Sequence, residues 1–143
     1  IATIGKWLEG RETNPARTPR FSGRILLVDD NPEIREASTC LLEALGCQVQ
    51  SASSGEEALQ LGPEADFDLV LMDCRMPGLD GYATTRAWRA RERGTPTAII
   101  ALTAGDPDES RAQCREAGMN DFLAKPFSEQ ELVTLLRRWL APQ

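Results

Sequence analysis

Residues 24–30 read RILLVDD, an apolar run that ends in two carboxylates, Asp29 and Asp30. A second apolar run ends in the same way, because residues 68–73 read DLVLMD and finish at Asp73. Short continuous apolar runs are typical of strands that are buried on both faces of a parallel sheet. Ligands bind outside the carboxyl ends of such strands. We therefore expect the three carboxylates to share one acidic site.

Carboxylates gathered in one site need a counter-charge. Two like charges roughly 5 Å apart repel by about 3 kcal/mol at an effective dielectric constant of about 20. The group must therefore hold protons or a cation. Hard oxygen ligands that leave room for water and phosphate oxygens suit Mg²⁺, for which Mn²⁺ could substitute.

Apolar strand-like segments alternate with helix-like segments from Gly23 onward. We expect strands at 24–28, 47–52, 68–73, 97–102 and 120–124, and helices at 32–45, 55–61, 81–93, 107–117 and 129–140. This alternation predicts an α/β fold: a five-stranded parallel sheet, doubly wound as (βα)5, with helices on both faces.

The expected helices carry their own signals. Asn31 precedes Pro32, and a side-chain cap followed by proline is favoured at a helix start. Ile34, Leu41 and Leu45 then fall on one face, which predicts the side of the first helix that packs on the sheet. Capping-box spacings mark two further helix starts, at Ser54 with Glu57 and at Ser128 with Glu131.

The first 22 residues differ from the rest of the chain. Residues 11–20 are polar, contain two prolines and show no hydrophobic period, which is typical of a linker. We expect residues 1–22 to be a linker or the tail of an upstream domain, and residues 23–143 to form the domain itself. The chain begins with Ile1 rather than Met, so we expect it to be a fragment of a longer protein.

The composition excludes several classes of function. The net charge is −6 and no basic run is present, so direct nucleic-acid binding is not expected. The chain has neither an apolar stretch of roughly 20 residues nor a signal peptide, so we expect no membrane contact by this segment and a cytoplasmic location, although the parent protein could be membrane-anchored. The chain has no histidine, which excludes histidine triads, histidine bases and histidine metal ligands.

The four cysteines form no CxxC pair; they are Cys40, Cys47, Cys74 and Cys114. Three of them occupy positions where an apolar residue is expected. We interpret them as reduced, mostly buried thiols of a cytosolic domain rather than as a disulfide or a metal site.

Two further polar residues are expected at the edge of the sheet that carries the acidic site. Thr103 ends the fourth apolar run and Lys125 ends the fifth. A hydroxyl and an ammonium group there can hold phosphoryl oxygens and offset developing charge. Each residue also has a plain structural explanation: Thr103 as a β-branched strand residue, Lys125 as an ion-pair partner, and Asp73 as a strand end that starts a turn. Five such residues at the ends of four strands favour a shared site.

Five short motifs surround these residues, in this order: Val28-Asp29-Asp30-Asn31, Leu71-Met72-Asp73, Met76-Pro77-Gly78-Leu79-Asp80-Gly81, Ala101-Leu102-Thr103-Ala104 and Lys125-Pro126-Phe127. Their order and spacing resemble those of the receiver domain of two-component response regulators. The resemblance covers about residues 23–141 and implies the flavodoxin-like receiver fold. Residues 72–82 and 135–140 are most similar to receivers fused to hybrid sensor histidine kinases.

The resemblance implies a magnesium site and a phosphoacceptor. Asp73 would take a phosphoryl group from the phosphohistidine of a histidine kinase or a histidine phosphotransfer domain. Asp30 and Asp73 would bind Mg²⁺ directly, together with the backbone carbonyl of Arg75. Asp29 would reach the metal through water. Thr103 and Lys125 would bind phosphoryl oxygens.

The resemblance also implies a conformational switch. The Lys125–Pro126 peptide bond would be cis. Phosphorylation would draw Thr103 toward the phosphoryl group and let Phe122, at the aromatic switch position, turn inward. The surface made by 107–117, 120–124 and 129–140 would then change shape, which is a population shift between two states. The oligomeric state would be a monomer or a weak dimer.

Other functions remain open from the residues. A stand-alone response regulator, or a degenerate receiver that acts only as a protein-binding module, would carry the same fold. Whether the chain counts as an enzyme is uncertain, since a receiver promotes only its own phosphorylation and dephosphorylation. A haloacid-dehalogenase-like phosphatase needs an acidic residue two positions after its nucleophile, where this chain has Arg75. A nucleotide-binding domain is disfavoured because no glycine-rich loop follows the first strand.

Overall fold

The computed structural model describes residues 20–94, 96–104 and 107–140. The strands are β2 (Arg24–Val28), β3 (Gln48–Ala52), β4 (Leu69–Asp73), β5 (Ala98–Thr103) and β6 (Asp121–Ala124). The helices are α1 (Pro32–Ala44), α2 (Gly55–Leu61), α3 (Gly81–Arg91), α4 (Pro107–Ala117) and α5 (Glu129–Trp139), with a short 3₁₀ turn, η1 (Pro63–Ala65). The alternation predicted from the sequence is therefore present throughout the described domain.

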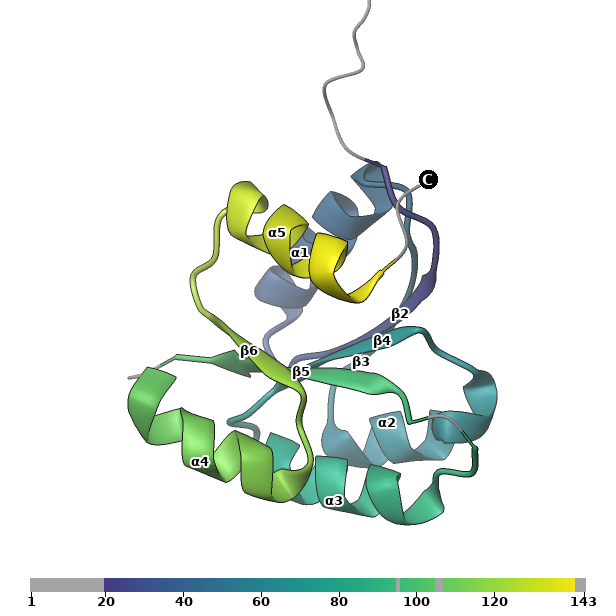
Figure 1. Cartoon of the computed structure of the whole chain (residues 1–143), viewed down its shortest axis with the longest axis vertical. Coiled ribbons are helices and arrows are strands. Elements are labelled where there is room, and N and C mark those ends of the chain that lie inside the picture. The colour runs from purple at the N-terminus through teal and green to yellow at the C-terminus, as the bar shows by residue number, and fades with distance from the viewer. Residues whose placement is uncertain (1–19, 95, 105–106, 141–143) are drawn as a thin grey trace, which may run out of the picture.

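The five strands form one sheet in the order β3-β2-β4-β5-β6, and every neighbouring pair is parallel. Helices α1 and α5 cover one face of the sheet, and α2, α3 and α4 cover the other (Figure 1). The structure confirms the predicted doubly wound α/β fold. Because the strands are parallel, the residues that follow β2, β4, β5 and β6 all emerge at one edge of the sheet.

Side chains from the central strands alternate between two hydrophobic cores. Ile25 and Leu27 of β2 pack on the α1/α5 side, whereas Leu26 and Val28 pack on the α2/α3/α4 side. The same alternation continues in β4 and β5, and all of these positions are buried. A strand buried on both faces needs apolar residues at every position, which is why the runs in the sequence are continuous.

The predicted helix starts carry the caps that their sequences favour. The Asn31 side chain accepts hydrogen bonds from the backbone N–H groups of Glu33 and Ile34 at the start of α1. Ser128 and Glu131 form a reciprocal capping box at the start of α5. These caps satisfy N–H groups that have no partner within the helix.

The structure corrects several predicted boundaries. Helix α3 ends at Arg91 rather than residue 93, β5 extends to Thr103, and the η1 turn was not predicted. Phe21, which falls within the expected linker, is buried and its N–H donates to the carbonyl of Leu45. Residues 1–19, the greater part of that expected linker, lie outside the described residues, as do residues 141–143 at the other end of the expected domain.

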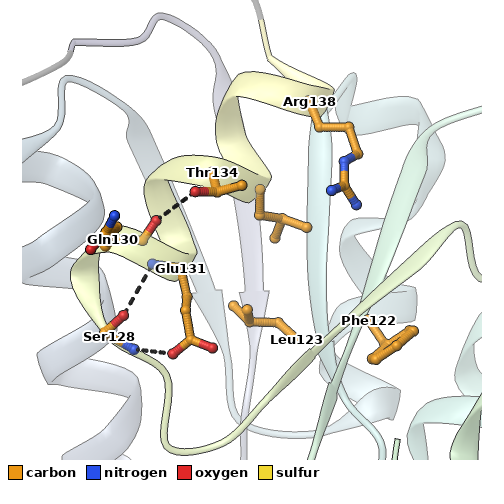
Figure 2. Close-up of a pocket in the computed structure, with 8 residues that line it drawn as sticks. Phe122, Leu123, Ser128, Gln130, Glu131, Thr134 and Arg138 are labelled. Carbon is orange, nitrogen blue, oxygen red and sulfur yellow. Dashed lines mark hydrogen bonds between the residues drawn. The ribbon is translucent and has the colours of Figure 1, made fainter. Parts of the chain in front are cut away.

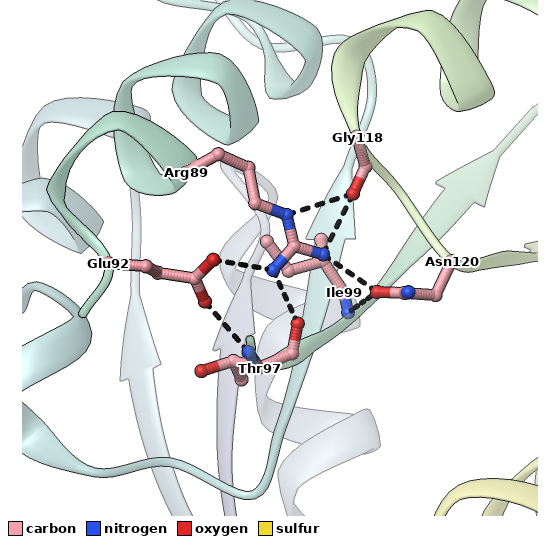
Figure 3. A network of polar contacts seen from close by, with 6 residues as sticks. All are labelled: Arg89, Glu92, Thr97, Ile99, Gly118 and Asn120. Carbon is pink, nitrogen blue, oxygen red and sulfur yellow. Dashed lines mark hydrogen bonds and ion pairs between the residues drawn. The ribbon is translucent and has the colours of Figure 1, made fainter. Parts of the chain in front are cut away.

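Arg89 ties α3 to the segment between α4 and β6. Its guanidinium makes five hydrogen bonds, to the carbonyls of Gly118 and Thr97 and to the side chains of Asn120 and Glu92 (Figure 3). These contacts use all five N–H groups of an arginine. The side-chain oxygen of Asn120, Oδ1, also accepts a hydrogen bond from the backbone N–H of Ile99. The network therefore fixes the end of α4 against β5.

Candidate functional site

The three predicted carboxylates meet at the edge of the sheet. Asp29 and Asp30 directly follow β2, and Asp73 is the last residue of the adjacent strand β4. One carboxylate oxygen from each residue lies within 4.8 Å of the others. Asp29 and Asp73 are buried, whereas Asp30 is exposed. The group therefore opens to solvent on the side of Asp30.

Lys125 lies over the two buried carboxylates. Its Nζ atom is 3.3 Å from Asp73 Oδ1 and 3.5 Å from Asp29 Oδ2. Lys125 follows the edge strand β6, and its backbone N–H donates to the carbonyl of Thr103. The Lys125–Pro126 peptide bond is cis. One ammonium group thus faces two buried carboxylates, which leaves the site with an excess of negative charge.

The pKa of Asp73 is raised from 3.8 to about 6. The main cause is burial, which disfavours the charged carboxylate, and the neighbouring charge of Asp29 adds to the rise. The ammonium of Lys125 opposes it, as does the hydrogen bond that Asp73 Oδ1 accepts from the N–H of Arg75. An additional cation would therefore relieve a real electrostatic cost at Asp73.

The loop between β4 and α3 folds closely back on the strand end. A Cβ atom at Gly81 would overlap the carbonyl oxygen of Asp73, so only glycine permits this approach. Asp80 caps α3 by accepting from the N–H of Ala83. The side chain of Arg75 is exposed. The loop therefore fixes the backbone around Asp73.

Two buried oxygens of the site, Asp29 Oδ2 and Thr103 Oγ1, have no hydrogen-bond partner within the described part of the chain. Buried polar atoms without partners are uncommon and call for an explanation. Three carboxylates, a hydroxyl and an ammonium group suit a hard cation together with an anionic oxygen group. The donor set therefore fits Mg²⁺ and a phosphoryl group.

Phe122 lies on β6 between helices α4 and α5. On one side it borders a hollow of about 380 Å³ whose other walls include Glu131, Thr134 and Arg138 of α5 (Figure 2). On the other side the guanidinium of Arg111, on α4, lies over the Phe122 ring. The ring is half-buried. The residue predicted to be the switch thus contacts the surface that was expected to change shape.

An apolar groove lies beside the acidic site, and the sequence did not reveal it. It has a volume of about 530 Å³ and is lined by Ile34, Ala37, Ser38, Leu41, Ala104, Lys125, Pro126 and Phe127. Ile34 was expected on the buried face of α1, but it is 36% exposed. The apolar face of α1, which was predicted to pack on the sheet, is therefore only partly buried. The part that includes Ile34 is exposed at the surface next to Lys125.

The cysteines are mostly buried, as the sequence predicted. Cys47, Cys74 and Cys114 are buried, Cys40 is exposed, and all four are free thiols. Burial raises the pKa of Cys74 to about 12, so this thiol stays protonated and unreactive near neutral pH.

Comparison with known proteins points to one family. The family model of the response regulator receiver domain matches residues 25–137. The sensor histidine kinase GacS of Pseudomonas protegens is 39% identical over 134 residues, which are 92% of this chain and 14% of that protein. Hybrid signal transduction histidine kinase A of Dictyostelium discoideum is 35% identical, over 92% of this chain and 6% of that protein. The chain thus spans only a small part of these relatives.

Solved structures agree with this assignment. The receiver domain of the sensor histidine kinase PA1611 from Pseudomonas aeruginosa is 45% identical, with a TM-score of 0.75 over 82% of this chain and 97% of that one. That crystal structure has a magnesium ion coordinated in its active-site cleft. The chemotaxis protein CheY4 of Vibrio cholerae gives a TM-score of 0.78 at 31% identity, over 83% and 99% of the two chains. Within the described ranges, this chain has no helix long and apolar enough to cross a bilayer.

Proposed function

The chain belongs to the response regulator receiver domain family, and on that premise we propose that Asp73 is its phosphoacceptor. The observation that carries the proposal is the placement of Lys125 Nζ, 3.3 Å from a buried carboxylate whose pKa is raised to about 6. A receiver needs an aspartate that is both reachable and held against a fixed positive charge. Asp73 is the described carboxylate that combines a strand end, burial and this contact.

The acidic site would hold Mg²⁺. Asp30 and Asp73 offer direct ligands, the backbone carbonyl of Arg75 a third, and Asp29 would act through water. The exposed side of Asp30 leaves room for the water molecules that Mg²⁺ usually retains. The bound ion would neutralise charge on the phosphoryl oxygens during transfer.

Phosphoryl transfer then requires few further groups. A carboxylate oxygen of Asp73 attacks the phosphorus of a phosphohistidine, the P–N bond breaks, and the imidazole nitrogen keeps the bonding electrons. Lys125 and the unpartnered hydroxyl of Thr103 would bind phosphoryl oxygens, which is the positioning and charge neutralisation that this reaction needs. The chain has no histidine, so the donor is a histidine kinase or a histidine phosphotransfer domain supplied by a partner or another part of the protein.

The apolar groove supports a docking surface for that donor. It adjoins Lys125 and is walled by α1, so a helix that lies against Ile34 and Leu41 would have its side chains close to Asp73. Apolar side chains that lie in such a groove gain from burial, and docking would align histidine and aspartate.

The proposed output is a shift between two conformations. Phosphorylation would recruit the Thr103 hydroxyl and let the Phe122 ring move inward. The walls that α4 and α5 build around this ring would then rearrange. The phosphoryl group can shift this equilibrium only by binding the two states differently.

The parent protein is proposed to be a hybrid sensor histidine kinase. The relatives GacS and kinase A carry a matching region within much longer proteins. Residues 1–22 would then link this receiver, residues 23–143, to the preceding domain, and the receiver would meet its donor in the cytoplasm as a monomer or weak dimer. A stand-alone regulator is the alternative, because the match to CheY4 of Vibrio cholerae covers 99% of that chain. The transcriptional regulatory protein ResD of Bacillus subtilis also matches, at 42% identity over 80% of this chain and 48% of that protein.

The direct test is the intact mass after incubation with acetyl phosphate and Mg²⁺. We expect one phosphoryl adduct in the wild type, none in Asp73→Asn, and none in the presence of EDTA. Asp68→Asn is a matched control, since Asp68 is an exposed carboxylate at the opposite end of β4. If Asp73→Asn were labelled as well as the wild type, the assignment of Asp73 would be wrong.

A further inference from the structure

Arg111 stacks on the aromatic residue of the proposed switch. Its guanidinium carbon lies 5.2 Å from the centroid of the Phe122 ring. Arg111 is an exposed residue of α4, whereas Phe122 is a half-buried residue of β6. The contact therefore links the Phe122 ring on β6 to the neighbouring helix α4.

The register of the sheet places Phe122 diagonally from Thr103. Phe122 pairs with Ala101 across β5 and β6, and Thr103 pairs with Ala124. Phe122, Ala101 and Thr103 therefore point to the same face of the sheet, and Thr103 is a diagonal neighbour within reach of an aromatic side chain. The residue that pairs with Phe122, Ala101, carries only a methyl group, so no large side chain of β5 stands between the ring and Thr103.

We propose that Arg111 is a positioning residue that holds the Phe122 ring against α4 and so opposes the switch. This inference rests on the proposed phosphoacceptor function and adds a residue that sets how readily the site responds. A cation over an aromatic face is attracted by the ring quadrupole. The attraction exists only while the ring lies beneath Arg111, so it stabilises one of the two states selectively.

The contact is specific to one arginine of α4. Arg115 lies one helical turn further on, is also exposed, and borders the same hollow of about 270 Å³ as Arg111 and Phe122. Of the cation–aromatic pairs in the described residues, the one at Phe122 involves Arg111. Arg115 thus offers the same charge on the same helix without the stacking.

The size of the effect follows from the strength of an exposed cation–π contact. Such contacts change an equilibrium by about two- to fivefold. If the inward state is the minor one, its population rises by that factor when the contact is lost. A ligand that binds only the inward state then binds more tightly by the same factor.

The test is a titration with beryllofluoride, a phosphoryl mimic, in the presence of Mg²⁺. The readout is the ¹⁹F resonance of 4-fluorophenylalanine placed at position 122. We expect Arg111→Gln to shift this resonance toward its beryllofluoride-bound position before any ligand is added, and to lower the apparent Kd about two- to fivefold. Arg111→Lys should restore much of the wild-type behaviour, because an ammonium group also interacts with the ring. Arg115→Gln should match the wild type.

The outcomes separate this inference from the function on which it rests. Equal affinities and equal resonances in Arg111→Gln and Arg115→Gln would overturn the role of Arg111 while leaving the phosphoacceptor site intact. Failure of beryllofluoride to bind the wild type would overturn the proposed function and this inference together. A uniform change in both glutamine variants would show an effect of net charge, which also overturns the specific role of Arg111.

Discussion

Lys125 holds its ammonium nitrogen 3.3 Å from Oδ1 of Asp73, yet the pKa of Asp73 is raised to about 6. The two facts are compatible because burial and the charge of Asp29 outweigh the attraction of one lysine. Asp73 is therefore held as an incompletely neutralised carboxylate. That state suits an acceptor which must bind a cation and then attack an anionic phosphoryl group.

Replacement of Lys125 by glutamine should change metal binding and phosphorylation in opposite directions. Removal of the ammonium group leaves the acidic site more negative, so Mg²⁺ should bind about tenfold more tightly. Phosphorylation should slow by about 10²-fold because a fixed charge on the phosphoryl oxygens is lost. Isothermal titration calorimetry and intact-mass kinetics measure the two effects.

The control for this variant is Arg137→Gln, which removes a positive charge from an exposed position on α5. It should leave both quantities near their wild-type values. Weaker Mg²⁺ binding in Lys125→Gln would contradict the electrostatic description of the site.

Asp73→Asn should stabilise the metal-free protein at neutral pH. The pKa of Asp73 is higher in the folded protein than its usual 3.8, so folding favours the protonated form. Below about pH 3 the group is protonated in both the folded and the unfolded state and has no effect. Above about pH 6 the charged folded form carries a penalty of about 3 kcal/mol at most. The attraction of Lys125 is already contained in that pKa. Because asparagine does not reproduce every contact of a protonated aspartate, we expect a gain of roughly 1–2 kcal/mol at pH 7.5.

Urea unfolding of the wild type and Asp73→Asn at two pH values checks whether the substitution raises the free energy of unfolding. The gain in the free energy of unfolding should be present at pH 7.5 and absent at pH 3. Added Mg²⁺ should narrow or reverse the difference at pH 7.5, because only the wild type keeps all three carboxylates. A variant that is less stable than the wild type at pH 7.5 without metal would show that burial of Asp73 carries no penalty.

Ile34→Asn should separate docking from chemistry. Ile34 lines the apolar groove and is itself exposed, so the substitution should leave stability nearly unchanged. The donor in this experiment is a phosphohistidine domain that labels the wild type. Loss of the apolar anchor should lower the rate of transfer from this donor by about tenfold or more. Labelling by acetyl phosphate, which needs no docking, should be unaffected.

Ala44→Asn is the matched variant for this experiment. It changes an exposed residue at the far end of the same helix, and transfer to it should proceed at the wild-type rate. Equal transfer to Ile34→Asn and Ala44→Asn would place the docking surface elsewhere.

Arg89→Lys should destabilise the domain although the charge is kept. Lysine cannot reproduce the fork of five hydrogen bonds that reaches Gly118, Asn120, Thr97 and Glu92 (Figure 3). We expect a loss of about 2 kcal/mol in the free energy of unfolding. Hydrogen exchange of the backbone around Gly118 should accelerate. Arg86→Lys, an exposed position on the same helix, should be within about 0.5 kcal/mol of the wild type.

The strands and the acidic site were predictable because their signals are local. A strand buried on both faces must be apolar at each position, so RILLV and LVLM identified β2 and β4, and parallel topology then placed Asp29, Asp30 and Asp73 together. The same logic placed Thr103 and Lys125, because each ends an apolar run.

Contacts between distant segments were not predictable in the same way. Nothing near Arg89 in the sequence indicates that its partners include Gly118 and Asn120, about one helix and one strand away. The exposure of Ile34 was also hidden, since helical spacing gives the apolar face of α1 but not where that face leaves the sheet. The stacking of Arg111 on Phe122 depends on how α4 packs, which periodicity does not specify.

Chemical localisation of the phosphoryl group decides whether Asp73 is the acceptor. Borohydride reduces an aspartyl phosphate to homoserine, and tandem mass spectrometry then identifies the residue that was converted. After phosphorylation with acetyl phosphate and Mg²⁺, we expect homoserine at position 73 and unchanged aspartate at positions 29 and 30. Homoserine at position 29 or 30, or no homoserine in protein that carries the phosphoryl mass, would contradict this assignment.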